Sequence, residues 1–250
     1  MGSVKRFLLL VPIALFMVFT SSCPSLSGEI TDAVKARDVV RVSSLLAAGA
    51  DVNEKVRGDF PLNVAALYGP AEMVTVLLAA GAKLEQPGRD GLQPLHNVVI
   101  IGNTSIVALL IQKGAALDAK DKLGRTPLVS FAVTGGGNIE IARLLLAAGA
   151  SPDIESAKED DSPTALQYAA ETGNAELVKL LLAAHVDVNH QNVWGWSSLH
   201  QAVTNDRPVI ARLLIAAGAD VNLVNKLGNT PLFMAPNDAL RKLLIEAGAK

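Results

Sequence analysis

Cysteine and aromatic residues are scarce in this chain. Cys23 is the only cysteine among 250 residues, so an intramolecular disulfide cannot form. Phe, Trp and Tyr together make up 4% of the sequence, whereas half of all residues are hydrophobic. The core must therefore be built from Leu, Ala, Val and Ile, a composition that suits closely packed helices, because Ala lets backbones approach and Leu fills the remaining gaps.

The chain also lacks a strong charge of either sign. Its formal net charge is −2. Lys5 and Arg6 are the only charged residues among the first 23, so the remainder carries 20 basic and 24 acidic residues. A mildly acidic body without an arginine-rich or lysine-rich run argues against a nucleic-acid partner.

The first 23 residues have the pattern of a signal peptide. Lys5 and Arg6 form a basic start, and residues 7–19 form an unbroken apolar run. That run is shorter than the roughly 20 residues that a transmembrane helix needs, but it suits the apolar region of a signal peptide. We therefore expect residues 1–23 to direct export and residues 24–250 to form the mature protein.

Cys23 stands at the end of this segment, after Thr20, Ser21 and Ser22. These residues resemble a relaxed lipobox, although Thr20 stands where that pattern prefers Leu. The resemblance implies a lipid on Cys23 and, because Pro24 follows instead of Asp, passage to the outer membrane. Three alternatives remain open. Cys23 could be lost with a signal peptide that is cleaved without lipid attachment, it could stay as a free thiol near the new N-terminus, or the segment could be retained as a membrane anchor. The expected localisation is the periplasm, with the membrane contacted only through the lipid at Cys23.

An internal repeat dominates the rest of the chain. The segment Leu-Leu-Ala-Ala-Gly-Ala occurs at residues 45–50, 77–82 and 145–150, with close variants elsewhere. Its glycine position recurs at residues 49, 81, 114, 149, 185, 218 and 248, in steps of 30 to 36 residues. A period of this length is typical of stacked repeat proteins.

A second signature runs in phase with the first. Six leucines stand in boxes that resemble Thr-Pro-Leu-His: Leu62, Leu95, Leu128, Leu166, Leu199 and Leu232. Two signatures with one period of about 33 residues resemble the ankyrin repeat. The resemblance implies an all-α solenoid of about seven helix-turn-helix repeats with short β-hairpin loops, covering residues 28 to 250. It also implies that His96 and His200, at the box position, brace one repeat against the next.

Two insertions interrupt the period. About two residues are added at 135–137, between the two helices of the fourth repeat, and about three within the acidic stretch 155–161. Insertions in repeat proteins lie in loops and often on the binding face. Neutral drift is the competing interpretation, because loops tolerate extra length at little cost.

The candidate binding residues lie at the loop tips. The resemblance places partners on these tips and on the concave face of the first helices. The row just before each box contains varied residues, from which we select Asp59, Leu92, Arg125, Trp196 and Asn229. Trp194, two residues before Trp196, completes the set, because tryptophan is favoured as an interface anchor. Either tryptophan could instead fold back onto a neighbouring loop.

No enzymatic or metal-binding pattern is present in the sequence. His185 and His190 flank a loop without a cysteine or third histidine near them, so a zinc site is not expected. Neither a nucleophile elbow nor a phosphate loop occurs. We therefore expect no catalytic residue, no cofactor and no metal.

The functional expectation is a non-enzymatic, monomeric module for protein–protein interaction in the bacterial cell envelope. It resembles exported bacterial ankyrin proteins, some of which support periplasmic enzymes while others act as immunity proteins. The partner is accordingly expected to be a periplasmic enzyme that the module holds or regulates. The alternative is an immunity protein that neutralises a secreted toxin or lipase effector.

Overall fold

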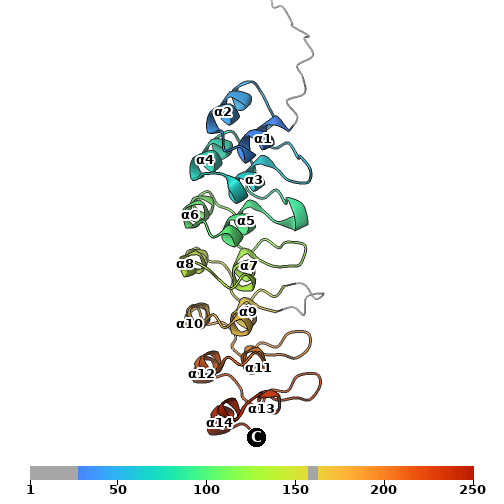
Figure 1. Ribbon diagram of the computed structural model, residues 1–250, viewed down its shortest axis with the longest axis vertical. Helices are drawn as coiled ribbons and strands as arrows, with labels where there is room; N and C mark the ends of the chain where they lie inside the picture. The colour runs from blue at the N-terminus through green and yellow to red at the C-terminus, as the bar shows by residue number, and fades with distance from the viewer. Residues whose placement is uncertain (1–27, 157–162) are drawn as a thin grey trace, which may run out of the picture.

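The computed structural model describes residues 28–156 and 163–250, and the expected signal peptide with Cys23 lies outside them. Fourteen α-helices in this part of the chain form seven antiparallel pairs, stacked along one axis (Figure 1). The inner helices are α1 (Glu29–Lys35), α3 (Pro61–Tyr68), α5 (Pro94–Ile101), α7 (Pro127–Val133), α9 (Ala165–Thr172), α11 (Ser198–Thr204) and α13 (Pro231–Met234). The outer helices are α2 (Val39–Ala47), α4 (Ala71–Ala79), α6 (Thr104–Gln112), α8 (Ile139–Ala147), α10 (Ala175–Ala183), α12 (Pro208–Ala216) and α14 (Asp238–Glu246). The all-α solenoid of seven repeats is thus confirmed.

Short polar side chains determine where the helices begin. The hydroxyl of Thr126 accepts a hydrogen bond from the N–H of Val129 at 3.3 Å, and Pro127 occupies the first helical position of α7. Most outer helices begin with an Asn or Asp cap, as at Asn174, whose Oδ1 accepts from the N–H of Leu177. These caps satisfy N–H groups that a helix start leaves without an intrahelical partner.

Left-handed residues end the outer helices. Gly49, Gly81 and Gly218 follow their helices with φ of 90°, 87° and 93°, where a side chain would be strained. His185 takes the same place after α10 with φ of 59°, a conformation that is strained for a residue with a Cβ. Each such residue turns the chain toward the next repeat.

The core is a continuous column of small and branched side chains between the two helix layers. The box leucines of repeats two to six are buried: Leu62, Leu95, Leu128, Leu166 and Leu199. Alanines such as Ala169 and Ala202 are fully buried among them and allow the inner helices to pack closely. No pair of helices could bury its own apolar face, so neighbouring repeats stabilise one another.

Apart from residues 157–162, the loops that connect each outer helix to the next inner helix project together from the side of the inner helices (Figure 1). We call them fingers. They differ in one respect from the β-hairpins expected, because the described residues contain no β-strand and one isolated bridge, between Val56 and Asp59. A buried side chain holds the finger instead: Oδ1 of Asn192 accepts from the N–H groups of Trp194 and Trp196 at 3.0 and 2.9 Å. Asp121 and Asn225 do the same in their fingers.

The inserted residues after α7 pack against the next repeat. Gly135 and Gly136 have φ of 82° and 61°, and the side-chain amide of Asn174 donates to both of their carbonyls. The insertion is therefore part of the contact between repeats four and five. Most of the other inserted stretch, residues 157–162, lies outside the described residues.

Candidate protein-binding edge

The five residues selected just before the boxes occupy equivalent places along the stack. Each directly precedes the residue that caps an inner helix, so the five side chains form a row along the fingers rather than one closed pocket. Four of their carbonyl oxygens accept a hydrogen bond from a side chain of the preceding repeat: Leu92, Arg125, Trp196 and Asn229. The backbone of this row is thus tied to the helices, which leaves its side chains to vary.

The donors to this row are the third residues of the inner helices. His96 reaches the carbonyl of Arg125 through Nε2 at 3.0 Å, and His200 reaches that of Asn229 at 3.2 Å. The bracing role expected for both histidines is confirmed. Asn63 and Gln167 make the same connection at 2.9 and 2.7 Å, beyond the two histidines for which the resemblance implies it. Their amide donors at the box position were the signal in the sequence that could have revealed it.

Burial favours the neutral form of both histidines. Burial lowers the pKa of His96 below its ordinary value of 6.5, opposed by the hydrogen bond to the Arg125 carbonyl. Burial likewise lowers the pKa of His200, opposed by the carbonyl of Asn229. In each ring Nδ1 lies within hydrogen-bond distance of the N–H that precedes the inner helix. The neutral tautomer with a proton on Nε2 satisfies both contacts.

Asp59 and Leu92 border a groove on the inner-helix side of repeats two and three. Asp59 forms an ion pair with Arg89, with 3.0 Å between Oδ2 and Nε, and its Oδ1 accepts from the Arg89 N–H. The groove has a volume of about 310 Å³ and is lined by Lys35, Asp59, Val64, Leu67, Tyr68, Arg89, Leu92 and Asn97. Its mixed polar and apolar wall suits contact with another protein more than a small apolar ligand.

Arg125 and Asn229 are half-buried, and each forms hydrogen bonds within its own finger. Two guanidinium nitrogens of Arg125 lie 2.9 and 3.0 Å from Oδ2 of Asp121, a carboxylate that is almost completely buried. The backbone N–H of Asn229 donates to Oδ1 of Asn225. Arg125 therefore stabilises its finger as well as bordering the edge.

The two tryptophans of the chain lie on the same finger but differ in exposure. Trp194 is 54% exposed, whereas Trp196 is half-buried, with its ring tilted against His200 at a centroid distance of 6.1 Å. Trp194 thus exposes the larger apolar surface of the two.

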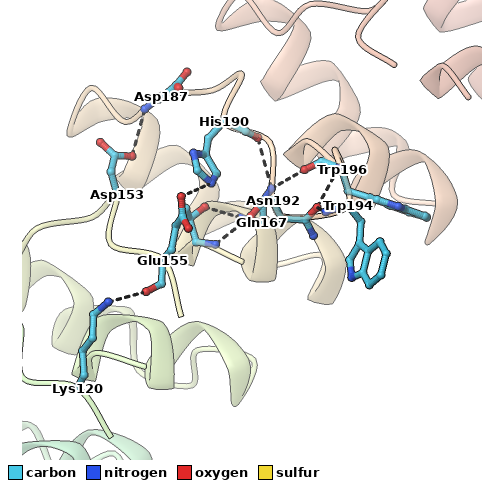
Figure 2. A network of polar contacts seen from close by, with 10 residues as sticks. Lys120, Asp153, Glu155, Gln167, Asp187, His190, Asn192, Trp194 and Trp196 are labelled. Carbon is cyan, nitrogen blue, oxygen red and sulfur yellow. Dashed lines mark hydrogen bonds and ion pairs between the residues drawn. The ribbon is translucent and has the colours of Figure 1, made fainter. Parts of the chain in front are cut away.

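A polar network ties this finger to the two repeats before it (Figure 2). Nε2 of His190 lies 3.3 Å from a carboxylate oxygen of Glu155, and Nζ of Lys120 donates to the backbone carbonyl of Glu155. Gln167 bridges the carbonyls of His190 and Trp196. The network fixes the finger that carries the two tryptophans against the preceding repeats. It contains no nucleophile paired with a base.

The described residues hold no cluster of three or more His, Cys, Asp or Glu that could bind a metal ion. None of the helices in residues 28–156 and 163–250 has the length and apolar character needed to cross a bilayer.

Comparison with known proteins gives the family. The sequence model for ankyrin repeats matches residues 83–156 and 166–250, well over half of the chain. The chain belongs to the ankyrin repeat family. The crystal structure of the ankyrin repeat domain of Bcl-3 superposes on this ankyrin solenoid with a TM-score of 0.78 and 26% identity, covering 86% of this chain and 97% of that domain.

Curated ankyrin relatives are similar over shorter stretches. Protein phosphatase 1 regulatory subunit 12A of Mus musculus is 34% identical over 99 residues, which are 40% of this chain and 9% of that protein. A putative ankyrin repeat protein of fowlpox virus is 40% identical over 116 residues, covering 44% of this chain and 24% of the viral protein. The matches therefore span a small part of these relatives and concern the repeats, which are modules for protein–protein interaction.

Proposed function

We propose that this ankyrin protein acts in the bacterial cell envelope as an exported, non-enzymatic module that holds or regulates a periplasmic partner protein. The observation that carries the proposal is the finger edge. Its backbone is tied to the repeats by equivalent hydrogen bonds, whereas its side chains change from repeat to repeat. A rigid scaffold with a varied edge suits recognition of one protein surface.

The proposed location follows from the sequence of residues 1–23. A basic start, an apolar run of signal-peptide length and small residues before Cys23 support export and lipid attachment. A lipid at Cys23 would restrict the solenoid to the membrane surface, and stable anchoring requires at least two acyl chains. We propose that the module acts as a monomer, contacts the outer membrane only through this lipid, and does not bind nucleic acid.

Labelling cells with a radioactive fatty acid tests the anchor. The wild-type chain is expected to incorporate label, and Cys23→Ser is expected to lose it. Absence of label from the wild type would refute lipid attachment while leaving the binding role open.

A photo-crosslinking residue placed on the finger edge tests the binding role in living cells. We expect one predominant product from position 92 or 196 and none from position 43, which is exposed on α2. A resident enzyme in the product would support a scaffold role, and a secreted toxin would support the immunity role. Equal products from positions 43, 92 and 196, or turnover of a substrate by the purified chain, would refute the proposal.

A further inference from the structure

Two pairs of neighbouring fingers are joined tip to tip. The first finger pair consists of residues 89–92 and 122–125, and the second finger pair of residues 193–196 and 226–229. In the first, the N–H of Lys122 donates to the carbonyl of Asp90 at 2.8 Å. In the second, the N–H of Lys226 donates to the carbonyl of Trp194 at 2.9 Å. Each hydrogen bond joins two loops from different repeats into one surface.

Glycines allow this close approach. A Cβ on Gly91 would lie 2.8 Å from the backbone nitrogen of Lys122, and one on Gly195 would lie 2.9 Å from that of Lys226. Both glycines also have φ near 77°. The finger pairs are therefore built into the backbone and are in place before any partner arrives, which reduces the entropy cost of binding.

The same sequence, Lys-Leu-Gly, forms the second member of each pair, at residues 122–124 and 226–228. The first members of the two pairs differ at the residue whose carbonyl accepts the joining hydrogen bond, which is Asp90 in one pair and Trp194 in the other. Asp90 lies across from Lys122, with 3.8 Å between its carboxylate and Nζ. Trp194 takes the place of Asp90 in the second finger pair, and Lys226 forms no ion pair with any described residue. The first finger pair partly neutralises its own lysine, and the second does not.

The second finger pair also exposes more apolar surface. Leu227 is 78% exposed and Trp194 is 54% exposed, against 38% for Leu123 in the first finger pair. Leu227 and Trp194 are both large apolar side chains that face water in the free chain, and tryptophan is among the residues that contribute most to binding when it is covered. If a partner that covers Trp194 and Leu227 carries a carboxylate beside its apolar side chains, that carboxylate can pair with the ammonium group of Lys226.

We propose that the second finger pair is the anchor point of the partner, and that it accepts a segment in which apolar side chains are flanked by Asp or Glu. Trp194 and Leu227 cover the apolar side chains, and the ammonium group of Lys226 pairs with a flanking carboxylate. The proposal rests on the proposed protein-binding function and names the chemistry of the segment that this module recognises.

Intrinsic fluorescence gives a direct test, because Trp194 and Trp196 are the only tryptophans of the chain and both lie in the second finger pair. The probes are three short synthetic peptides without tryptophan. In the first, Asp and Glu flank Leu and Phe; in the second, Lys replaces the acids; in the third, Ser replaces Leu and Phe. The first peptide is expected to change the emission of the full mature chain in a saturable manner and to bind at least about tenfold tighter than the other two.

Charge reversal on the protein provides the matched control. Lys226→Glu is expected to reverse the preference, so that the Lys-containing peptide binds tighter than the acidic one. Lys122→Glu, on the equivalent finger, is expected to leave the preference unchanged. Binding of the first two peptides with equal affinity, no response to the first, or an equal loss from Lys122→Glu and Lys226→Glu would overturn the proposal.

The outcome is separable from that of the proposed function. If Lys226→Glu retains the crosslinked partner in cells at the wild-type level, the binding role stands and the anchor assignment fails. If no partner crosslinks from any finger position, the proposed function itself fails.

Discussion

The third residue of four inner helices joins one repeat to the next. Histidine, asparagine and glutamine all serve at this position, because each places a nitrogen donor on the carbonyl before the next helix. Val129 occupies the position in repeat four and has no such donor. The junction between repeats four and five instead has the hydrogen bonds from Asn174 to the inserted glycines.

Acid should weaken the stack through its two buried histidines. Because burial lowers the pKa of His96 and His200 in the folded chain, the unfolded chain binds more protons below its pKa of about 6.5. The free energy of unfolding is therefore expected to be greatest above pH 6.5 and to fall as the pH drops below it. Urea denaturation between pH 5 and about 8, followed by circular dichroism, measures this slope.

The double variant His96→Gln and His200→Gln is the control, because Gln167 already supports the same two hydrogen bonds without titrating. It should remain folded at pH 7 and show a smaller loss of stability toward pH 5. An unchanged slope would assign the acid sensitivity to other groups.

At the scale of the elements, the inserted glycine loop after α7 forms part of the contact between two repeats. Gly136 packs against Phe131 and Asn174, and Asn174 also caps α10. The added length therefore creates a contact between repeats instead of a loose projection. A contact of this kind is neither loop drift nor a binding loop, the two roles that the sequence leaves open for the insertion.

Alanine substitutions at the two neighbouring glycines of this loop should differ in their effect on the free energy of unfolding. Gly136→Ala would place a Cβ 2.6 Å from Nδ2 of Asn174 at φ of 61°, so we expect a loss of about 1–3 kcal/mol in the free energy of unfolding. Gly137→Ala meets nothing within 4 Å and should change stability by less than about 0.5 kcal/mol. Chemical denaturation of both variants measures the difference, and equal effects would show that the loop does not support the stack.

At the scale of the whole molecule, stability depends on neighbours. Each internal repeat packs against two others, whereas the last one packs against a single repeat and has an inner helix of four residues. Its box leucine, Leu232, is half-buried, unlike the buried leucines of repeats two to six. The last repeat is therefore expected to be less stable than the central repeats.

Hydrogen exchange should reveal this gradient along the solenoid. Amides of α13 and α14 are expected to exchange faster than those of α7, α9 and α10, because opening the last repeat breaks one interface and opening a central repeat breaks two. Mass spectrometry of peptides after timed exchange measures it. Uniform protection along the chain would indicate that the seven repeats unfold as one unit.

The sequence by itself determined the repeat period, because the two signatures recur in phase along the chain. The resemblance to ankyrin repeats that this period carries also indicated the bracing role of His96 and His200, which the structure confirms. The functional residues proposed at the row before each box, with the lipid on Cys23, remain predictions.

Only the tertiary structure decided which side chains of the edge are available to a partner. Trp194 is more exposed than Trp196 because the ring of Trp196 lies against His200 of its own repeat. The joining of fingers into pairs depends on where one repeat sits on the next, and Lys226 reaches Trp194 across 32 residues of sequence. Such contacts between repeats are set by the packing of the helices and not by any local pattern, which is why the sequence did not reveal them.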